Sequence, residues 1–324
     1  MSTENIEMRS EYAIQVLLAT YNGSRYLAAF LNSLLAQDCQ EWCLVVRDDC
    51  STDNTSELLG RYLPLFGDRL QILPDSGRNN LGVVGNFSRL LSASTAPYVM
   101  FADQDDIWHP DKISLTLAAM RHREVEVGTG RPILVHTDLV VVDEDLQTVA
   151  ASYWRYQGLV PSRGHALGHM MVENIVWGCT SMLNRTLVDL TGEIPHEARF
   201  HDWWISLVAA AFGDIESLPV QTIDWRRHGA NDSEITKLPE VVRRTVTGMP
   251  DMISRLARLL ESSRPRVRLF LERYRGRLKA DQIAAIEAFL DLPTLGLLAR
   301  RRAVLQHRLF FTSRLRTGGL LLLV

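Results

Sequence analysis

The most constraining feature of the sequence is an apolar run that ends in a cluster of carboxylates. Residues 98–102 are apolar, and three carboxylates follow within four residues, at Asp103, Asp105 and Asp106. Short apolar runs bounded by polar residues are typical of buried strands. In an open α/β sheet the carboxyl ends of the strands form the ligand crevice. The pattern predicts a ligand site at a strand end. The alternative is an acidic turn that caps the helix starting near Pro110.

Like charges this close repel one another, and a bound cation relieves the repulsion. The Asp103-Gln104-Asp105 sequence offers the hard oxygen ligands that Mg²⁺ or Mn²⁺ prefers. Such an ion could neutralise a nucleotide diphosphate. The sequence therefore predicts Mg²⁺ or Mn²⁺ as a cofactor.

The chain of 324 residues can form one large α/β domain or two smaller ones. Its net charge of −3 conceals an asymmetry, because residues 241–324 contain 17 basic and 6 acidic side chains, a net charge of +11, which leaves −14 for residues 1–240. We expect an acidic body, residues 1–238, followed by a basic helical extension, residues 239–324.

Cysteine usage and hydropathy indicate the compartment. Four cysteines, at positions 39, 43, 50 and 179, have neither C-x-x-C spacing nor a histidine at zinc-finger distance, so we expect them to be reduced. Residues 1–11 are polar and lack the apolar core of a secretory signal. No run of about 18 apolar residues suggests a membrane span. These features favour a cytoplasmic protein.

The first half of the chain alternates strand and helix patterns. This alternation implies a parallel sheet with right-handed crossovers, and hence an α/β fold. Strands are predicted at 13–19, 42–46, 70–73 and 98–102, and helices at 26–36, 55–63, 86–91 and 112–123.

The second half is less regular. Residues 150–170 are expected to form an irregular, substrate-facing loop, and residues 174–184 an extended segment with a tight glycine. Strands are predicted at 132–136, 138–143 and 218–225, a helix at 205–212, and long helices at 241–260 and 266–290.

Seven motifs over about residues 12–235 resemble, in order and spacing, those of glycosyltransferase family 2, and within it the sequences usually labelled rhamnosyltransferases. The resemblance implies a GT-A fold, a Rossmann-like, mostly parallel sheet flanked by helices. The motifs are Thr20-Tyr-Asn-Gly23, Arg47-Asp-Asp-x-Ser-x-Asp-x-Thr55, Asn86-Phe87, Asp103-Gln-Asp-Asp-x-Trp108, Gly178-Cys-Thr180, His201-Asp-Trp-Trp204 and Arg226-Arg-His-Gly-x-Asn231.

The resemblance implies a nucleotide site at the first strand ends. Tyr21 would pack on a pyrimidine base, and one carboxylate of the Asp48-Asp49 pair would accept from the base imide N–H, a contact that discriminates strongly when buried. A helix-capping loop is the alternative for this pair, and a simple turn is the alternative for Asn86. The implied nucleotide-binding residues are Thr20, Tyr21, Asn22, Asp48, Asp49, Asn86 and Asp103.

The resemblance also implies a metal site. Asp105 would bind the metal, which would stabilise the charge on the leaving diphosphate. His228 would be a second ligand, since a neutral imidazole suits these ions with mixed ligands; a surface histidine in a turn is the alternative. Asp106 and Trp108 would face the donor sugar or acceptor, although Trp108 could equally lie in the core. Arg227 stands where the family more often has Gln.

Asp202 is the candidate general base. Inverting transfer needs a carboxylate that takes the proton from the acceptor hydroxyl as it attacks the anomeric carbon. The family usually carries Glu-Asp or His-Asp before an aromatic residue here, and His201-Asp202 fits. Trp203 would offer an apolar face to a sugar, although one of the two tryptophans, Trp203 and Trp204, is expected to lie in the core. The alternative for Asp202 is an N-cap of the helix at 205–212.

The C-terminal stretch mixes basic and apolar side chains. This mixture suits an anionic membrane surface, as a lipid-linked acceptor would require, or a solvated, partner-facing helix. Nucleic acid is not expected as a partner, because no recognised binding motif is present. The residues are Arg300, Arg301, Arg302, Arg308, Arg314 and Arg316, with Leu305, Leu309, Phe310, Phe311 and Leu320 to Val324.

The resemblance therefore predicts an inverting, metal-dependent transferase that moves a sugar, with dTDP-L-rhamnose the favoured donor, to a saccharide or lipid-linked hydroxyl in bacterial surface polysaccharide synthesis. A UDP-sugar donor is one alternative. A nucleotidyltransferase is another, but residues 20–25 lack its glycine-rich, lysine-bearing loop. A non-catalytic scaffold would be expected to lack Asp105, Asp202 or His228, and all three are present.

Overall fold

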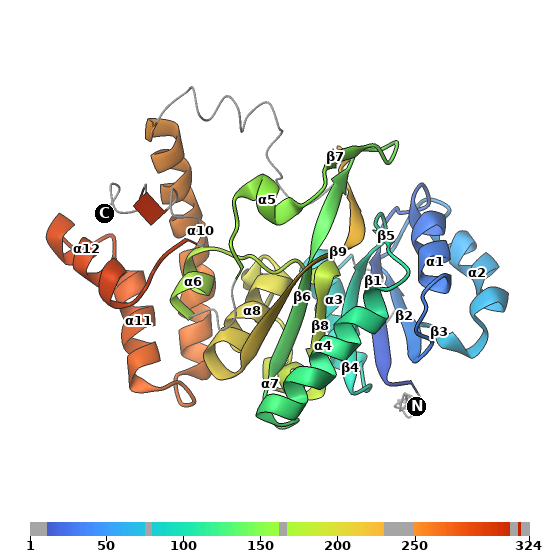
Figure 1. Cartoon of the computed structure of the whole chain (residues 1–324), viewed down its shortest axis with the longest axis horizontal. Helices are drawn as coiled ribbons and strands as arrows, with labels where there is room; N and C mark the ends of the chain where they lie inside the picture. The colour runs from blue at the N-terminus through green and yellow to red at the C-terminus, as the bar shows by residue number, and fades with distance from the viewer. Residues whose placement is uncertain (1–11, 75–79, 162–166, 230–248, 312–316, 319–324) are drawn as a thin grey trace.

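The structure is a computed structural model that describes residues 12–74, 80–161, 167–229, 249–311 and 317–318. Its first half follows the predicted alternation (Figure 1). The helices begin or end up to four residues from the predicted limits. The elements are β1 (Ile14–Thr20), α1 (Leu27–Leu35), β2 (Trp42–Asp48), α2 (Thr55–Phe66), the short 3-10 helix η1 (Gly67–Arg69), β3 (Leu70–Ile72), α3 (Gly82–Ala93), β4 (Tyr98–Asp103) and α4 (Lys112–Val127).

The described strands form one nine-stranded sheet in the order β3-β2-β1-β4-β8-β6-β9-β5, with β7 paired to β6. Strands β2 and β4 both run parallel to β1, with Thr20 opposite Asp48 and Ala19 opposite Asp103. The parallel register therefore brings the first, second and fourth motifs to the same edge of the sheet. Central strands of this kind are buried on both faces, which explains their nearly continuous apolar sequence.

The second half of the sheet is mixed. Strand β8 (Ser181–Asn184) lies antiparallel between β4 and β6, and the two-residue β5 (Ile107–Trp108) lies antiparallel to the end of β9. Strand β9 (Asp214–Arg226) runs parallel to β6 and is longer than predicted. Strand β7 (Thr148–Ala150) completes the sheet.

A single strand, β6 (Ile133–Val142), replaces the two predicted at 132–136 and 138–143. The sequence suggests a break because Asp138 interrupts the apolar pattern. The structure keeps the strand because the buried carboxylate of Asp138 accepts hydrogen bonds from the Ser152 hydroxyl (2.5 Å), the Trp154 backbone N–H (3.0 Å) and the Gln221 amide (2.9 Å). A buried carboxylate that is fully hydrogen-bonded is tolerated within a strand.

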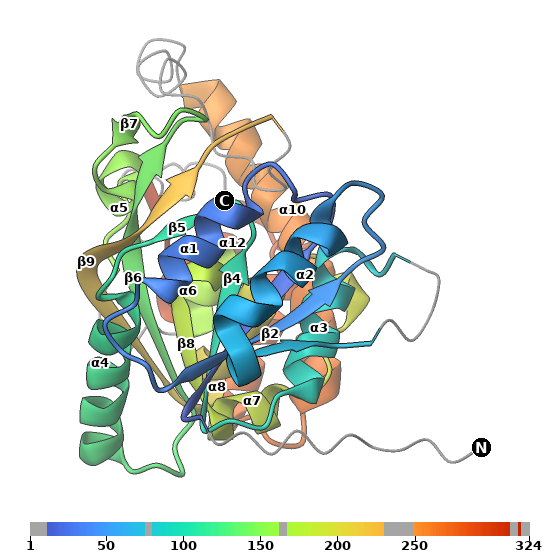
Figure 2. The ribbon, with the colours of Figure 1, turned by 90° about the vertical axis from the view of Figure 1, so that its right-hand side faces the viewer.

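Helices cover both faces of the sheet. In Figure 2, α4 lies on one side of β6 and β8, whereas α7 (Arg185–Thr191) and α8 (His201–Phe212) lie on the other. Helix α3 packs on β1 and β2 and also contacts α8. This packing places the first turn of α8 close to the edge of the sheet that carries the motifs.

The region expected to be an irregular loop, residues 150–170, contains helices. Helix α5 (Tyr153–Gln157) begins after Ser152, whose hydroxyl accepts from the Arg155 N–H, and ends at Gly158 in the left-handed region (φ 64°). Helix α6 (Leu167–Val172) follows residues 162–166, which lie outside the described residues. The extended segment predicted at 174–184 includes a 3-10 turn, η2 (Gly178–Thr180), and a second one, η3 (His196–Ala198), precedes α8.

The C-terminal helices pack against the body. Helix α10 (Met249–Tyr274) continues through Pro265, where two helices were predicted, and is followed by α11 (Ala280–Asp291) and α12 (Leu297–Gln306). The rings of Phe270 and Tyr274 on α10 lie against Trp204 of α8, with centroids 5.8 and 6.1 Å away. These helices lie on the side of the molecule opposite α1 and α2 (Figure 1).

The predicted division between the two parts falls within residues 230–248, outside the described residues. Among the helices described, none is both long and apolar enough to cross a bilayer.

Candidate active site

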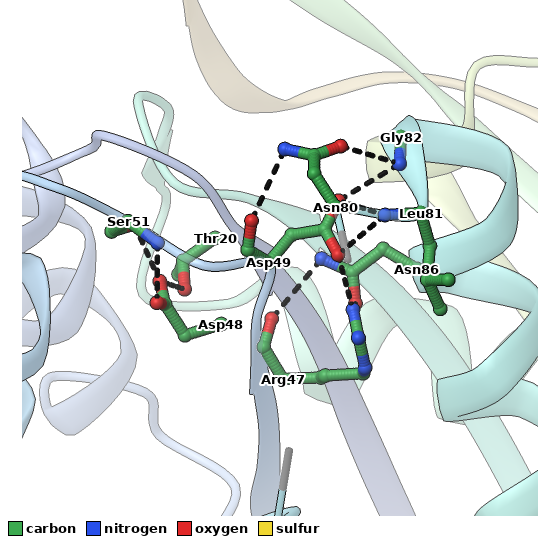
Figure 3. Close-up of polar contacts among 9 residues, drawn as sticks. All are labelled: Thr20, Arg47, Asp48, Asp49, Ser51, Asn80, Leu81, Gly82 and Asn86. Atoms are coloured by element: carbon green, nitrogen blue, oxygen red, sulfur yellow. Dashed lines mark hydrogen bonds and ion pairs between the residues drawn. The ribbon is translucent and has the colours of Figure 1, made fainter. Parts of the chain in front are cut away.

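The ends of β1 and β2 are joined through Asp48 (Figure 3). Its carboxylate accepts hydrogen bonds from the Thr20 hydroxyl (2.7 Å), the Ser51 hydroxyl (2.6 Å) and the Ser51 N–H (2.9 Å). Thr20 is buried, whereas Asp48 is half-buried. The first two motifs therefore form one preorganised strand-end surface.

The neighbouring Asp49 is buried and turns toward α3 (Figure 3). It accepts from the Arg47 guanidinium (2.6 Å) and from the backbone N–H groups of Leu81 (2.9 Å) and Gly82 (2.8 Å). The capping alternative thus describes Asp49 well, although the helix it holds is α3 and not the adjacent α2.

Asn86 lies inside α3, so the alternative of a simple turn is wrong. Its side-chain amide donates to the Arg47 carbonyl (3.1 Å), and its side-chain oxygen accepts from the Arg47 guanidinium (3.2 Å). Asn86 is 2% exposed. In the structure, Asn86 therefore holds the Arg47 side chain in place. A contact of Asn86 with ribose or base stays a prediction.

The first motif is tied to the acidic motif by Gln104. The Gln104 side chain accepts from the Tyr21 N–H (3.0 Å) and donates to the Tyr21 carbonyl (2.9 Å). A Cβ on Gly23 would lie 2.0 Å from the Gln104 side-chain oxygen, so a larger residue there would displace the Gln104 side chain from this contact. The Tyr21 side chain remains 50% exposed, and Asn22 connects the loop to the second motif through Ser51 and Thr52. An exposed ring at this place is available to a ligand.

The end of β9 brings His228 to the acidic motif. His228 Nε2 lies 2.7 Å from Asp105 Oδ2, and its ring stacks on Tyr26 with centroids 4.9 Å apart. The Arg226 guanidinium lies over Tyr26 and donates to the Asp105 carbonyl (3.1 Å). The His228 side chain is only 10% exposed, so the alternative of a surface histidine does not hold.

Asp106 and Trp108, predicted to face the sugar or acceptor, lie in the core instead. Asp106 is fully buried, and its burial beside Asp105 and Asp103 raises its pKa well above the usual range. Trp108 is 2% exposed and packs edge-on against Phe30. The core alternative is therefore correct for Trp108.

A buried lysine accompanies them. The Lys112 ammonium lies 4.7 Å from the centre of a Trp108 ring, and burial lowers its pKa to about 8. Asp106, Lys112 and the Cys179 thiol influence one another's charge, and burial raises the pKa of Cys179 well above its usual range. These three buried side chains therefore pack in the core next to the acidic motif.

Two groups of side chains are candidates for a cation. Within the described residues, Asp103, Asp106 and Cys179 have ligand atoms within 4.8 Å of one another. However, burial raises the pKa of Asp106 and of Cys179, which favours a neutral carboxyl and a protonated thiol, and metal ligands must be deprotonated. The second group is Asp105 and His228, whose partly exposed side chains meet at the acidic motif. A carboxylate with a neutral imidazole fits Mg²⁺ or Mn²⁺ better than a thiol does.

Asp202 lies in the first turn of α8, and the N-cap residue is Phe200, so Asp202 is not the N-cap. Its carboxylate accepts from the Gly178 N–H (3.1 Å) and the Asn174 amide (3.2 Å). Burial raises its pKa to about 6, although the N–H groups of Gly178 and Trp203 and the charge of Arg266 oppose the rise. A carboxylate with a pKa near neutrality is suited to general base catalysis.

The residues on either side of Asp202 are core residues. Burial lowers the pKa of His201 to about 3, so the ring is neutral, and it packs against Phe87 with centroids 4.1 Å apart. Trp203 is 5% exposed, its indole N–H donates to the Met170 carbonyl (2.6 Å), and Arg266 covers one face of the ring at 3.7 Å. The expectation that Trp203 offers a free face to a sugar is therefore corrected.

Sequence reasoning did not assign several residues that shape this site. Gln104, Tyr26 and Arg226 lie within or beside the motifs, so their positions in the sequence could have marked them as site residues. Asn174 and Arg266 lie outside every motif, and only the folded chain brings them to Asp202.

Comparisons with known proteins show the family of the chain. The family model described as "Glycosyl transferase family 2" matches residues 15–183. The dTDP-rhamnosyl transferase RfbG of Shigella flexneri is 36% identical over 100 residues, which is 30% of this chain and 34% of RfbG. The putative teichuronic acid biosynthesis glycosyltransferase TuaG of Bacillus subtilis is 30% identical over 110 residues, 34% of this chain and 42% of TuaG. The chain thus spans less than half the length of either relative.

The fold is shared with a solved structure. S. aureus TarS 1-349 in complex with UDP-GlcNAc superposes with a TM-score of 0.52 over 88% of this chain and 82% of that one, at 16% identity. This likeness confirms the predicted GT-A fold class. The chain belongs to glycosyltransferase family 2, and so to the transferase class of enzymes.

Proposed function

We propose that the protein is an inverting, divalent-metal-dependent glycosyltransferase that uses a nucleotide diphosphate sugar. The observation that carries the proposal is the 2.7 Å contact between Asp105 of the fourth motif and His228 of the seventh, which meet at the end of the acidic motif. A ligand set of this chemistry beside Asp103 suits a cation that neutralises a diphosphate.

Each part of the site then has one task. The Tyr21 ring would stack on the base, and a carboxylate of the Asp48-Asp49 pair would read the base imide, with Asp48 the more exposed of the two. Asp105 and His228 would hold the cation, which when bound supplies Lewis-acid stabilisation of the leaving diphosphate. Asp202 would take the proton from the acceptor hydroxyl.

We favour dTDP-L-rhamnose as the donor. The support is the rhamnosyltransferase-like Asp103-Gln-Asp-Asp-x-Trp108 motif together with the similarity to RfbG. A UDP-sugar is the alternative. A saccharide or lipid-linked acceptor in bacterial surface polysaccharide synthesis follows from the same resemblance.

A donor survey tests the proposal. Calorimetry with dTDP-rhamnose, UDP-glucose, UDP-galactose and GDP-mannose, with Mg²⁺, with Mn²⁺ and with EDTA, should give metal-dependent binding of one donor. Asp105→Asn should lose this binding, whereas the exposed control Asp145→Asn should keep it. Turnover should release nucleoside diphosphate. Release of pyrophosphate would favour a nucleotidyltransferase, and no binding of any donor would favour a scaffold.

We also propose that α12 contacts an anionic membrane. Its exposed side carries Leu297, Leu298 and Leu305, which are 62, 83 and 57% exposed, together with the exposed Arg301 and Arg302. Helical spacing puts these five residues on one side of α12. Leucines between arginines suit the interface of a negatively charged bilayer, and the net charge of +11 over residues 241–324 adds attraction.

The surface differs from the one expected from sequence. Leu309 and Phe311 are buried, while Arg314, Arg316 and residues 320–324 lie outside the described residues.

The protein should sediment with phosphatidylglycerol vesicles but not with phosphatidylcholine vesicles. This binding should depend on the leucines and weaken with salt. Leu297→Ser with Leu298→Ser should reduce it, whereas Val125→Ser, at an 86% exposed site on α4, should not. Self-association without vesicle binding would favour a partner-facing helix.

A further inference from the structure

Helix α10 places a buried arginine against Trp203, the residue that follows the proposed general base. Arg266 is 1% exposed. Its Nε donates to the Ala198 carbonyl (2.7 Å), and its guanidinium lies flat over Trp203, 3.7 Å from the ring centre. Its Nη1 has no hydrogen-bond partner among the described residues. Burial of a guanidinium is costly unless an opposite charge lies near.

The opposite charge is Asp202. Burial lowers the pKa of Arg266 to about 10, against the attraction of Asp202, so the guanidinium stays ionised at neutral pH. Arg199 is a like charge nearby that opposes this. His201, adjacent to Asp202 on α8, is neutral.

The remaining groups on Asp202 carry no net charge. They are the backbone N–H groups of Gly178, Asp202 and Trp203 and the side-chain amide of Asn174. Arg266 is a cation that acts on Asp202, and it comes from the C-terminal extension, outside the segment matched by the family model.

We propose that Arg266 is a positioning residue of the acid–base centre, whose charge keeps Asp202 ionised at working pH and whose plane fixes Trp203. The inference rests on the proposed role of Asp202. It makes the C-terminal extension part of the active site, so that removal of α10 would impair proton transfer as well as packing.

The pH dependence of kcat/KM tests the proposal. Loss of a nearby positive charge raises a carboxyl pKa, so in Arg266→Gln the acidic limb should move to higher pH. A shift of one pH unit lowers the rate on that limb about tenfold. Arg266→Lys keeps the charge and should leave the limb in place. Arg268→Gln, which removes an exposed arginine two residues further along α10, should behave like the wild type.

Several outcomes would overturn the inference. An unmoved limb in a folded Arg266→Gln or Arg266→Met variant would do so, as would an equal shift in Arg266→Lys. If both neutral variants fail to fold, the pH dependence of Arg266→Lys becomes the test. A shift of its acidic limb would contradict a role based on charge. Full activity of Asp202→Asn would instead refute the proposed base, which separates the two failures.

Discussion

The two halves of the candidate site treat their charged groups in opposite ways. At the ends of β1 and β2, donors meet every carboxylate: Asp48 accepts from Thr20 and Ser51, and Asp49 from Arg47 and the start of α3. Around α8, burial shifts the pKa values of the charged groups. There the pKa of Asp202 is raised to about 6 and that of Arg266 is lowered to about 10.

The difference teaches what each region can do. Carboxylates held by several hydrogen bonds keep a fixed geometry, which suits recognition of a ligand. A carboxyl group such as Asp202, whose pKa is raised to about 6, can exchange protons at working pH, while Arg266 stays charged. The comparison predicts that changes around α8 alter kcat, whereas changes at the β1 end alter binding.

The largest effect is expected for Asp202→Asn. Asn cannot take a proton, so kcat should fall on the order of 10³-fold, with the donor KM nearly unchanged. Rates measured at saturating donor and acceptor check this result. A fall in donor affinity with normal kcat would contradict the division between the two regions.

The same variant also sharpens the comparison through stability. The folded-state pKa of Asp202 lies above the ordinary 3.8, at about 6, so its contribution to stability is present below pH 3.8 and is lost as pH rises through 6. Asn does not ionise, so the Asp202→Asn variant lacks this loss of stability with rising pH. The Tm of Asp202→Asn relative to the wild type should therefore rise between pH 4 and pH 7, whereas Asp145→Asn should show no such trend.

Local patterns explain why the β1 end was predictable. Strands β1, β2 and β4 are buried on both faces, so their apolar runs and the turn residues after them mark both the strands and the site. Parallel pairing then brings the motifs together. The α/β fold could therefore be predicted from the strand and helix patterns, whereas the GT-A class was predicted from the resemblance of the motifs to the family.

The rest depends on contacts between distant residues. Nothing near Asp138 in the sequence shows that Ser152 and Gln221 would satisfy it within one strand. The motif pattern placed Trp108 and Trp203 at the sugar, but Phe30 of α1 packs on Trp108 and Arg266 of α10 on Trp203, and both rings are buried. Burial by an element more than 50 residues away leaves no local signal.

An intermediate effect is expected for Tyr21→Ala. Stacking of a base on an aromatic ring is worth about 1–3 kcal/mol, so the donor KM should rise about 5- to 150-fold while kcat stays close to the wild type. Tyr21→Phe keeps the ring and should keep the affinity. The backbone contacts of Tyr21 with Gln104 do not involve its ring, so the alanine variant should retain its Tm. A fall in kcat alone would place Tyr21 outside the nucleotide site.

The smallest effect is expected for Tyr26→Leu, which tests how the β1 end and the end of β9 share the cation site. The Tyr26 ring stacks on His228 and lies under Arg226, so it orients an imidazole that also contacts Asp105. An aromatic pair is worth about 0.5–1.5 kcal/mol, which predicts a rise of about 2- to 10-fold in the Mn²⁺ concentration for half-maximal activity.

Tyr26→Phe is the matched control for this change. The Tyr26 hydroxyl is buried without a hydrogen-bond partner among the described residues, so phenylalanine removes an unsatisfied group and keeps the stack. Its metal dependence should equal that of the wild type, with an unchanged or higher Tm. Equal metal dependence in the leucine variant would mean that His228 does not need the stack, because Arg226 and Asp105 suffice to hold the end of β9 against the acidic motif.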